Sequence, residues 1–224
     1  MANAVHMARL AVAAGTDTMV ATPHEAQFGR SSAPPHWLRG LVKELQSVLN
    51  QKQVPLTVVP GVEIKIGPRV AEGLAARTLM TLGDTGRWAL LEPPFDRIAP
   101  EALAQVQAVR AAGFDVVIAH PERSREVQLS LAFVEACADM GCAFQLTTGS
   151  LLGHFGGAAQ RAAETLLTHA HEWPLVLASD THDLVDRSPS FMPQAEARAA
   201  ALVGPTEARR MTDERPRAML SPAR

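Results

Sequence analysis

The positions of apolar residues along the chain follow two alternating patterns, one typical of helices and one typical of short buried strands. Apolar side chains recurring every three or four positions predict amphipathic helices. The predicted helices cover 2–14, 37–51, 69–79, 100–112, 129–140, 158–171 and 194–203. Between them, short runs rich in aliphatic residues predict strands at 17–22, 56–63, 88–92, 114–120, 142–147 and 174–179. Helix and strand therefore alternate along the whole chain.

Alternation of this kind predicts a parallel sheet with helices packed against it. One strand, its helix and two loops take up roughly 30 residues, which matches the spacing seen here. No linker or change of composition divides the chain, so we expect a single domain over 1–224. Its last part, about 204–224, mixes Pro with several Arg, and we expect a short helix at 207–211 in a partly frayed tail. The segment 25–36 reads as a polar, Pro-rich loop over the presumed site.

Side chains able to bind a metal ion stand at the carboxyl ends of five of the six predicted strands. These side chains are His24, Glu63, Glu92, His120, Asp180 and His182. An open doubly wound sheet usually gathers its ligands at one switch point, whereas a closed barrel brings every strand's carboxyl end to a common centre. The recurrence therefore favours a barrel, with the six side chains meeting at its mouth.

Carboxylates and imidazoles suit Mn, Zn, Fe, Co or Mg, and a shared carboxylate can bridge two ions. A single His or Glu at a strand end is more often a capping or salt-bridged surface residue than a ligand. Because six of them recur at about one per strand–helix unit, the ligand interpretation is favoured here. Glu63 taken alone also fits simple strand alternation in VEIK. We expect a cluster of two or three divalent ions.

Composition excludes several other classes of function. The formal net charge is -2 and the sequence pI about 6.4, so no global basic field attracts nucleic acid. No apolar run approaches the roughly 18 residues that a membrane span needs, and we expect no membrane insertion. The first residues lack both a basic start and a clear cleavage site, which makes the cytoplasm the simplest location. The two cysteines, Cys137 and Cys142, are interpreted as reduced core residues.

The segments ATPH, PGVEI, ALLEPPF, VIAHPER, DMGC and ASDTHD occur in this order. Together they resemble the polymerase-and-histidinol-phosphatase (PHP) superfamily, and within it the bacterial manganese-dependent protein-tyrosine phosphatases encoded with capsule and exopolysaccharide genes. The resemblance runs from about residue 5 to residue 217; AHPER and SD-x-H are its specific parts. It implies a distorted seven-stranded TIM-like (β/α) barrel, Mn as cofactor, and hydrolysis of phosphotyrosine on a protein, plausibly a bacterial tyrosine kinase.

Carried over by position, the resemblance assigns the six side chains to three ion sites: Glu63, Glu92 and His120; Glu63 and Asp180; His24 and His182. Only the first of these would be complete in this chain. His182 has a second interpretation, in which it protonates the leaving phenolate.

Two arginines are candidate phosphate ligands. Arg123 follows His120 at the barrel mouth, and Arg187 lies in the loop after the last predicted strand. Guanidinium groups are planar forked donors that suit phosphoryl oxygens. The alternative for Arg123 is an ordinary salt bridge with Glu122 or Glu126.

Family members begin with a strand bearing D-x-H-x-H, whereas this chain begins at the helix 2–14. The histidines of that strand and an aspartate of the loop after it are therefore absent. We expect the natural start to lie upstream, with full activity requiring it, because all six downstream ligand positions are intact; a decayed copy is the alternative.

Other functions remain open at this point. One is a small-molecule phosphatase, such as one acting on histidinol phosphate, and another is a catalytically dead binding partner of a kinase or a polysaccharide assembly. A thiol-based phosphatase is excluded, because that mechanism needs an arginine six residues after the nucleophile. Ala143 and Thr148 occupy those positions after Cys137 and Cys142.

Overall fold

Two parallel sheets form the centre of the computed structural model, which describes residues 1–25 and 34–221. The smaller sheet pairs β1 (Thr18–Ala21) with β2 (Thr57–Pro60). The larger sheet contains, in spatial order, β3 (Glu63–Lys65), β4 (Trp88–Glu92), β5 (Asp115–Ala119), β6 (Ala143–Thr147) and β7 (Leu175–Ala178). All of the pairings are parallel, so the predicted α/β class is confirmed.

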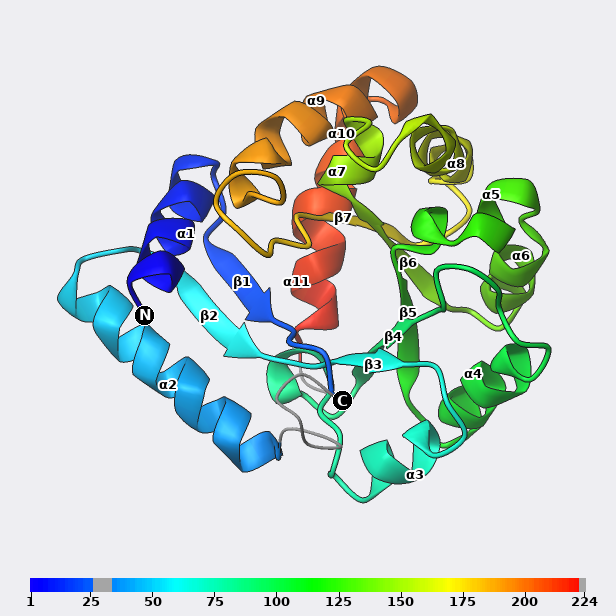
Figure 1. The fold of residues 1–224 in the computed structure, drawn as a ribbon, viewed down its shortest axis with the longest axis horizontal. Coiled ribbons are helices and arrows are strands. Elements are labelled where there is room, and N and C mark those ends of the chain that lie inside the picture. Colours follow the sequence, from blue (N-terminus) through cyan, green and yellow to red (C-terminus); the bar gives the residue numbers. More distant parts are fainter. Residues whose placement is uncertain (26–33, 222–224) are drawn as a thin grey trace.

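Helices surround these strands. Their bounds are α1 (Ala2–Ala13), α2 (Pro35–Gln51), α3 (Val70–Ala75), α4 (Ala102–Ala111), α5 (Arg125–Leu129), α6 (Ala132–Asp139), α7 (Thr148–Leu151), α8 (Gly157–Leu167), α9 (Met192–Val203), α10 (Pro205–Arg209) and α11 (Arg215–Met219). In Figure 1, α1 to α4, α6, α8 and α9 form an outer ring, while α11 lies between β1 and β7. Within residues 1–25 and 34–221, no helix combines the length and apolar character needed to cross a bilayer.

The single strand predicted at 56–63 is wrong in one respect, because the chain breaks it into β2 and β3 at Gly61 and Val62. A Cβ at Gly61 would lie 2.9 Å from Cγ1 of Val20, so glycine allows the chain to pass this close to β1. The two sheets meet here, because the Glu63 amide donates to the Pro23 carbonyl (3.2 Å) and the Glu25 amide donates to the Glu63 carbonyl (3.1 Å).

Three predicted helical segments also need correction. The helix predicted at 129–140 corresponds to α6 and begins only at Ala132, and the short helix α5 before it was not predicted. The helix predicted at 69–79 ends at Ala75, shortly before Arg77 adopts a positive φ of 55°. The tail is helical from Pro205 to Met219, with a π-helical turn at 210–214, and is not frayed over that range. It is ordered because Met211 is fully buried in the main core. Most of the predicted polar loop 25–36 lies outside the described residues.

The strands have apolar side chains on both faces, as expected for a parallel sheet covered on both sides. Leu91 and Ile118 face outward into the main core beneath the helices. Their neighbours Leu90 and Val117 face inward, where they pack with Met219, the last residue of α11. A separate cluster joins α1 and α2 to the small sheet. The strands therefore curve around an interior that α11 partly fills.

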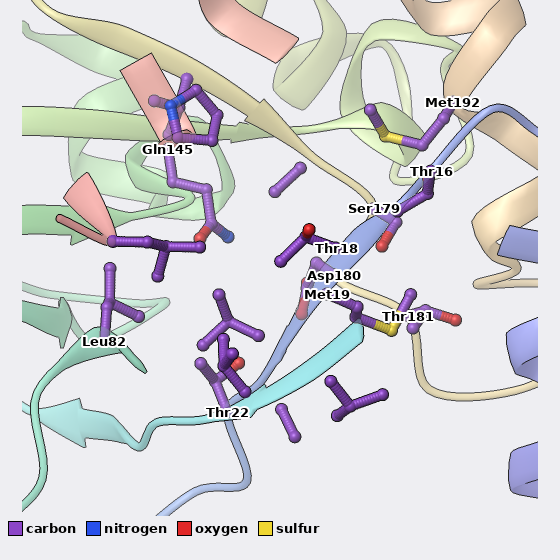
Figure 2. Close-up of a pocket in the computed structure, with 18 of the residues that line it drawn as sticks. Thr16, Thr18, Met19, Thr22, Leu82, Gln145, Ser179, Asp180, Thr181 and Met192 are labelled. Carbon is purple, nitrogen blue, oxygen red and sulfur yellow. The ribbon is translucent and has the colours of Figure 1, made fainter. Parts of the chain in front are cut away.

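The curved sheet is interrupted between β1 and β7, which do not pair with each other in the described part of the chain. A cavity of about 1280 Å³ lies there, lined by residues of 16–24 on one side and 176–182 on the other. Figure 2 shows Thr18 and Met19 of β1 close to Asp180 and Thr181, with Gln145 reaching in from β6. This cavity opens beside the strand ends that carry the candidate ligands.

Candidate metal and phosphate site

The candidate ligands lie at or just after strand ends on one side of the sheets. His24 follows β1, Glu92 ends β4, His120 follows β5 directly, and Asp180 lies two residues beyond β7. Glu63 was predicted to end a strand, but it begins β3 at the junction of the two sheets. Parallel strands explain the convergence, since their carboxyl ends all point to the same edge.

Four of these side chains form a buried cluster. Nε2 of His120 lies 2.9 Å from Oε1 of Glu63 and 3.7 Å from Oε1 of Glu92. Nε2 of His24 lies 3.2 Å from Oε2 of Glu63 and 3.9 Å from Oε1 of Glu92. Glu63, Glu92 and His120 are at most 5% exposed. The two carboxylates and His120 are thus shielded from solvent, whereas the His24 side chain is 26% exposed.

This donor set fits a divalent cation. One ligand atom each from His24, Glu63 and Glu92 lies within 4.8 Å of the others. This separation is close to the span of about 4.4 Å between opposite donor atoms of a single Zn- or Mg-sized ion. Two buried carboxylates side by side repel each other unless a cation neutralises them. In addition, Nδ1 of His120 is buried without a hydrogen-bond partner among the described residues.

The protonation of the cluster reflects its crowding. Burial opposes ionisation of Glu63 most strongly, but the hydrogen bond with His120 and the charges of the surrounding histidines outweigh it and lower the pKa of that carboxyl. Burial and the negative charge of Glu63 raise the pKa of Glu92. Burial tends to lower the pKa of His120, but its hydrogen bond and charge interaction with Glu63 prevail and raise it. Without a cation, Glu92 and His120 therefore tend to hold a proton, whereas Glu63 tends to be ionised.

Two ligand candidates have strained backbones. His120 has a φ of 30° and Asp180 a φ of 45°, in the left-handed region that non-glycine residues rarely adopt. Such strain costs of order 1–3 kcal/mol and persists only where the surroundings impose it. Both residues follow a buried strand directly or nearly so, and the strain turns the chain sharply across the strand ends.

Glu122, which sequence reasoning missed, anchors the turn after His120. Its Oε1 accepts hydrogen bonds from the Thr147 amide (3.0 Å), the Thr147 hydroxyl (2.9 Å) and the Ser150 hydroxyl (2.7 Å). Glu122 is fully buried. It therefore ties the turn carrying His120 and Arg123 to the end of β6.

Asp180 is the point on which the two arginines converge. Nη1 of Arg123 donates to Oδ2 of Asp180 at 2.9 Å, and Nη2 of Arg187 donates to the same oxygen. In the described part of the chain, Arg123 makes its salt bridge with Asp180 and none with Glu122 or Glu126. Glu126 instead accepts a hydrogen bond from the Ile98 amide. Two guanidinium groups thus point at one carboxylate oxygen.

The loop that carries Arg187 is closed by its own hydrogen bonds. The His182 amide donates to the Arg187 carbonyl (3.1 Å), and Oδ1 of Asp183 accepts from the amides of Val185, Asp186 and Arg187. Nδ1 of His182 lies 3.0 Å from the Asp180 carbonyl oxygen. The loop therefore holds Asp180, His182 and Arg187 in a fixed relation.

His24, which was expected to share an ion site with His182, contacts more than that one residue. Its ring centroid lies 5.9 Å from that of His182, as a shared site would require. However, His24 also contacts Glu63 directly and so joins the buried cluster. His182 remains at its rim, with a side chain 37% exposed. Residues of the three expected groups therefore lie next to one another.

Comparisons with known proteins match this chain and its fold. The family model described as "Capsular polysaccharide synthesis, CpsB/CapC" matches residues 1–221. Tyrosine-protein phosphatase YwqE of Bacillus subtilis is 36% identical over 191 residues, covering 84% of this chain and 72% of YwqE. The putative tyrosine-protein phosphatase CapC of Staphylococcus aureus is 26% identical over 187 residues, covering 83% of this chain and 71% of CapC. 

A solved structure is also similar, with a TM-score of 0.89 and 32% identity over 98% of this chain and 86% of the other. It comes from work on YwqE of Bacillus subtilis and CpsB of Streptococcus pneumoniae, described as unique metal-dependent tyrosine phosphatases. The agreement covers nearly the whole described chain and confirms the PHP-type fold.

Proposed function

Because this chain belongs to the CpsB/CapC family of capsular polysaccharide synthesis, we propose that it is a metal-dependent phosphatase that hydrolyses phosphotyrosine on a protein. The observation that carries this proposal is the cluster of two buried carboxylates and two imidazoles beside two converging arginines. The names of the relatives, which are tyrosine phosphatases, favour this substrate over histidinol phosphate.

We propose manganese as the metal, in two or three ions, with Zn, Fe, Co or Mg as alternatives. The residues proposed to hold it are His24, Glu63, Glu92, His120, Asp180 and His182. A divalent ion in such a site lowers the pKa of bound water and neutralises charge on phosphoryl oxygens. Glu63 has an oxygen toward each of two histidines, which supports a bridging role for this carboxylate.

The arginines supply the binding of the phosphoryl group. Arg123 and Arg187 already converge on one anionic oxygen, and a phosphoryl group offers three such oxygens to the same donors. Arg123 remains a cation although its burial lowers its pKa, because an arginine is protonated throughout the physiological range. The pair therefore orients the substrate and neutralises its charge.

His182 is proposed as the group that protonates the leaving phenolate when it is not a ligand. Its side chain is partly exposed at the rim, where a substrate can reach it. The Asp180 carbonyl oxygen lies 3.0 Å from Nδ1, so a proton on Nδ1 leaves Nε2 free to exchange one with the substrate. The natural substrate proposed is a tyrosine kinase that controls polysaccharide export, met in the cytoplasm.

Hydrolysis of p-nitrophenyl phosphate with added Mn tests the activity. The chain as printed and a form extended upstream in frame are assayed, together with Glu92→Ala and His120→Ala. We expect either substitution to abolish Mn-dependent turnover, because each removes a proposed ligand from a buried cluster. Exposed His6→Ala and Glu101→Ala serve as controls of the same residue types. Full activity of either site variant would refute the metal mechanism.

A second assay tests the substrate. A phosphotyrosine peptide and histidinol phosphate are compared by kcat/KM in the same preparation. We expect the peptide to be preferred by at least tenfold. Preference for histidinol phosphate would replace the proposed substrate, while Mn-dependent cleavage of neither compound would leave a non-catalytic binding role.

A further inference from the structure

Aromatic rings and cationic side chains alternate in a column at the mouth of the site. The Phe95 ring stacks on the His120 ring, with centroids 5.5 Å apart and planes 14° from parallel. The guanidinium carbon of Arg123 lies 4.7 Å from the Phe95 centroid and 4.4 Å from the Phe155 centroid. That of Arg187 lies 5.7 Å from the Phe155 centroid. Within the described residues, Phe155 is thus the ring that contacts both arginines.

The two guanidinium groups need such support. They carry like charges, and the positive charge of Arg187 contributes to lowering the pKa of Arg123. Only one carboxylate oxygen, Oδ2 of Asp180, binds both of them, and Nε of Arg187 is buried without a hydrogen-bond partner in the described part of the chain. The negative faces of aromatic rings attract cations and offset part of the repulsion.

The Phe155 ring occupies its position because a glycine, Gly149, leaves room for it. Gly149 lies within α7, and a Cβ there would be 2.7 Å from Cε2 of Phe155. The Gly149 carbonyl also accepts from the His154 amide at 2.8 Å. The His154 ring packs edge-on against Phe191, with centroids 4.7 Å apart. This turn between α7 and α8 therefore places one ring in contact with both arginines.

We propose that Phe155, assisted by Phe95, is a positioning residue that holds the guanidinium groups of Arg123 and Arg187 in register for one phosphoryl group. This inference rests on the proposed function, since it takes phosphate as the anion that the arginines bind. Contact with one shared ring restricts the positions of both cations, so that their donors converge on one anion-sized position. Asp180 marks that position here.

A leucine at position 155 would retain an apolar side chain but lack the negative electrostatic potential over the face of an aromatic ring. Phe155→Leu therefore separates cation binding from simple packing, and Phe155→Tyr should restore what leucine loses. Gly149→Ala displaces the ring without changing it. Phe191→Leu is the matched control, because it makes the same change in a ring that packs on the same turn through His154. Among the described residues, the cation–π contacts of Arg123 and Arg187 involve Phe95 and Phe155 and not Phe191.

The first measurement follows the Nε–H signals of Arg123 and Arg187 by NMR of ¹⁵N-arginine-labelled protein. The second is the affinity for inorganic phosphate by calorimetry with Mn present. We expect Phe155→Leu and Gly149→Ala to make both side chains more mobile and to weaken phosphate binding by about 3- to 20-fold, from the usual strength of cation–π contacts. Phe155→Tyr and Phe191→Leu should stay within twofold of the parent.

Unchanged arginine order and phosphate affinity in Phe155→Leu would overturn the inference. Equal losses in Phe155→Leu and Phe155→Tyr would do the same, because they would show a packing role alone. The NMR measurement does not depend on turnover. If arginine order depends on the ring but no aryl phosphate is hydrolysed, the positioning role stands and the proposed function fails.

Discussion

At the scale of single residues, two neighbouring glutamates have opposite tendencies. Glu63 accepts a hydrogen bond from His120 and keeps a lowered pKa, whereas Glu92 has a raised pKa because it is buried beside the charge of Glu63. Glu92 therefore opposes folding of the metal-free protein when it is ionised. A residue that weakens the fold and contacts a candidate metal site is typical of a functional position.

The substitution Glu92→Gln tests both consequences. The raised pKa means that the folded state binds more protons than the unfolded state, so the metal-free parent loses stability as pH rises above the ordinary value of 4.5. We expect the glutamine variant to be more stable than the parent at pH 7–8, with a difference that shrinks toward pH 4, in urea unfolding with EDTA present. 

The same variant should bind Mn at least about 100-fold more weakly, since even residues that only support metal ligands contribute 10–100-fold. Exposed Glu101→Gln is the control and should change neither quantity. A glutamine variant that is less stable at every pH would contradict the account of Glu92.

At the scale of elements, the two sheets meet where the chain passes from β2 to β3. It places Glu63 at the junction, where its backbone pairs with residues on either side of His24. The close passage of Gly61 past Val20 and Thr22 makes this possible. The register of the cluster thus depends on one glycine.

Two glycines provide a matched test of that statement. In Gly61→Ala the new methyl group would lie 2.9 Å from Val20 Cγ1 and 3.2 Å from Thr22 Cγ2, and we expect a loss of about 1–3 kcal/mol in the free energy of unfolding. In Gly40→Ala, on the exposed face of α2, nothing lies within 4 Å, and a gain of about 0.5–1 kcal/mol is expected. Chemical denaturation measures both; equal effects would show that Gly61 is not closely packed.

The element pattern also shows what the sequence could predict. Strands such as 88–92 were predictable because a short apolar run between turn signals is typical of a buried strand. Five of the six proposed ligands lie at or just after strand ends, and Glu63, which begins β3, is the exception. The break at Gly61 was not, since a continuous β-rich run gives no sign of a change of sheet. Nor was Phe155, because its partners lie on loops far away in the sequence and only the packing brings them together.

At the scale of the whole molecule, the candidate site joins distant parts of the chain. His24 contacts Glu63 and Glu92, and His182 lies beside His24 although more than half of the chain separates them. An ion bound there would link the small sheet to the large one. Its effect on stability should therefore be global.

Thermal unfolding measures this linkage. At about 100 times its Kd, Mn should add about 2.7 kcal/mol to the stability of the protein, equivalent to roughly 5–10 °C in Tm for a chain of this size. EDTA should reverse the shift, and His120→Ala should lack it. An equal shift in His120→Ala would place the ion elsewhere.

The helix between β1 and β7 has a further consequence. Arg215 of α11 donates to the carbonyls of Ala170 and Leu175 beside β7, and Arg217 pairs with Asp17 at the start of β1, at 2.6 Å. Asp17 and Arg217 are 200 residues apart in sequence. Contacts between such distant residues form slowly, because a long loop must close first. During synthesis, β1 leaves the ribosome early but meets this neighbour only after nearly all of the remaining chain has been made.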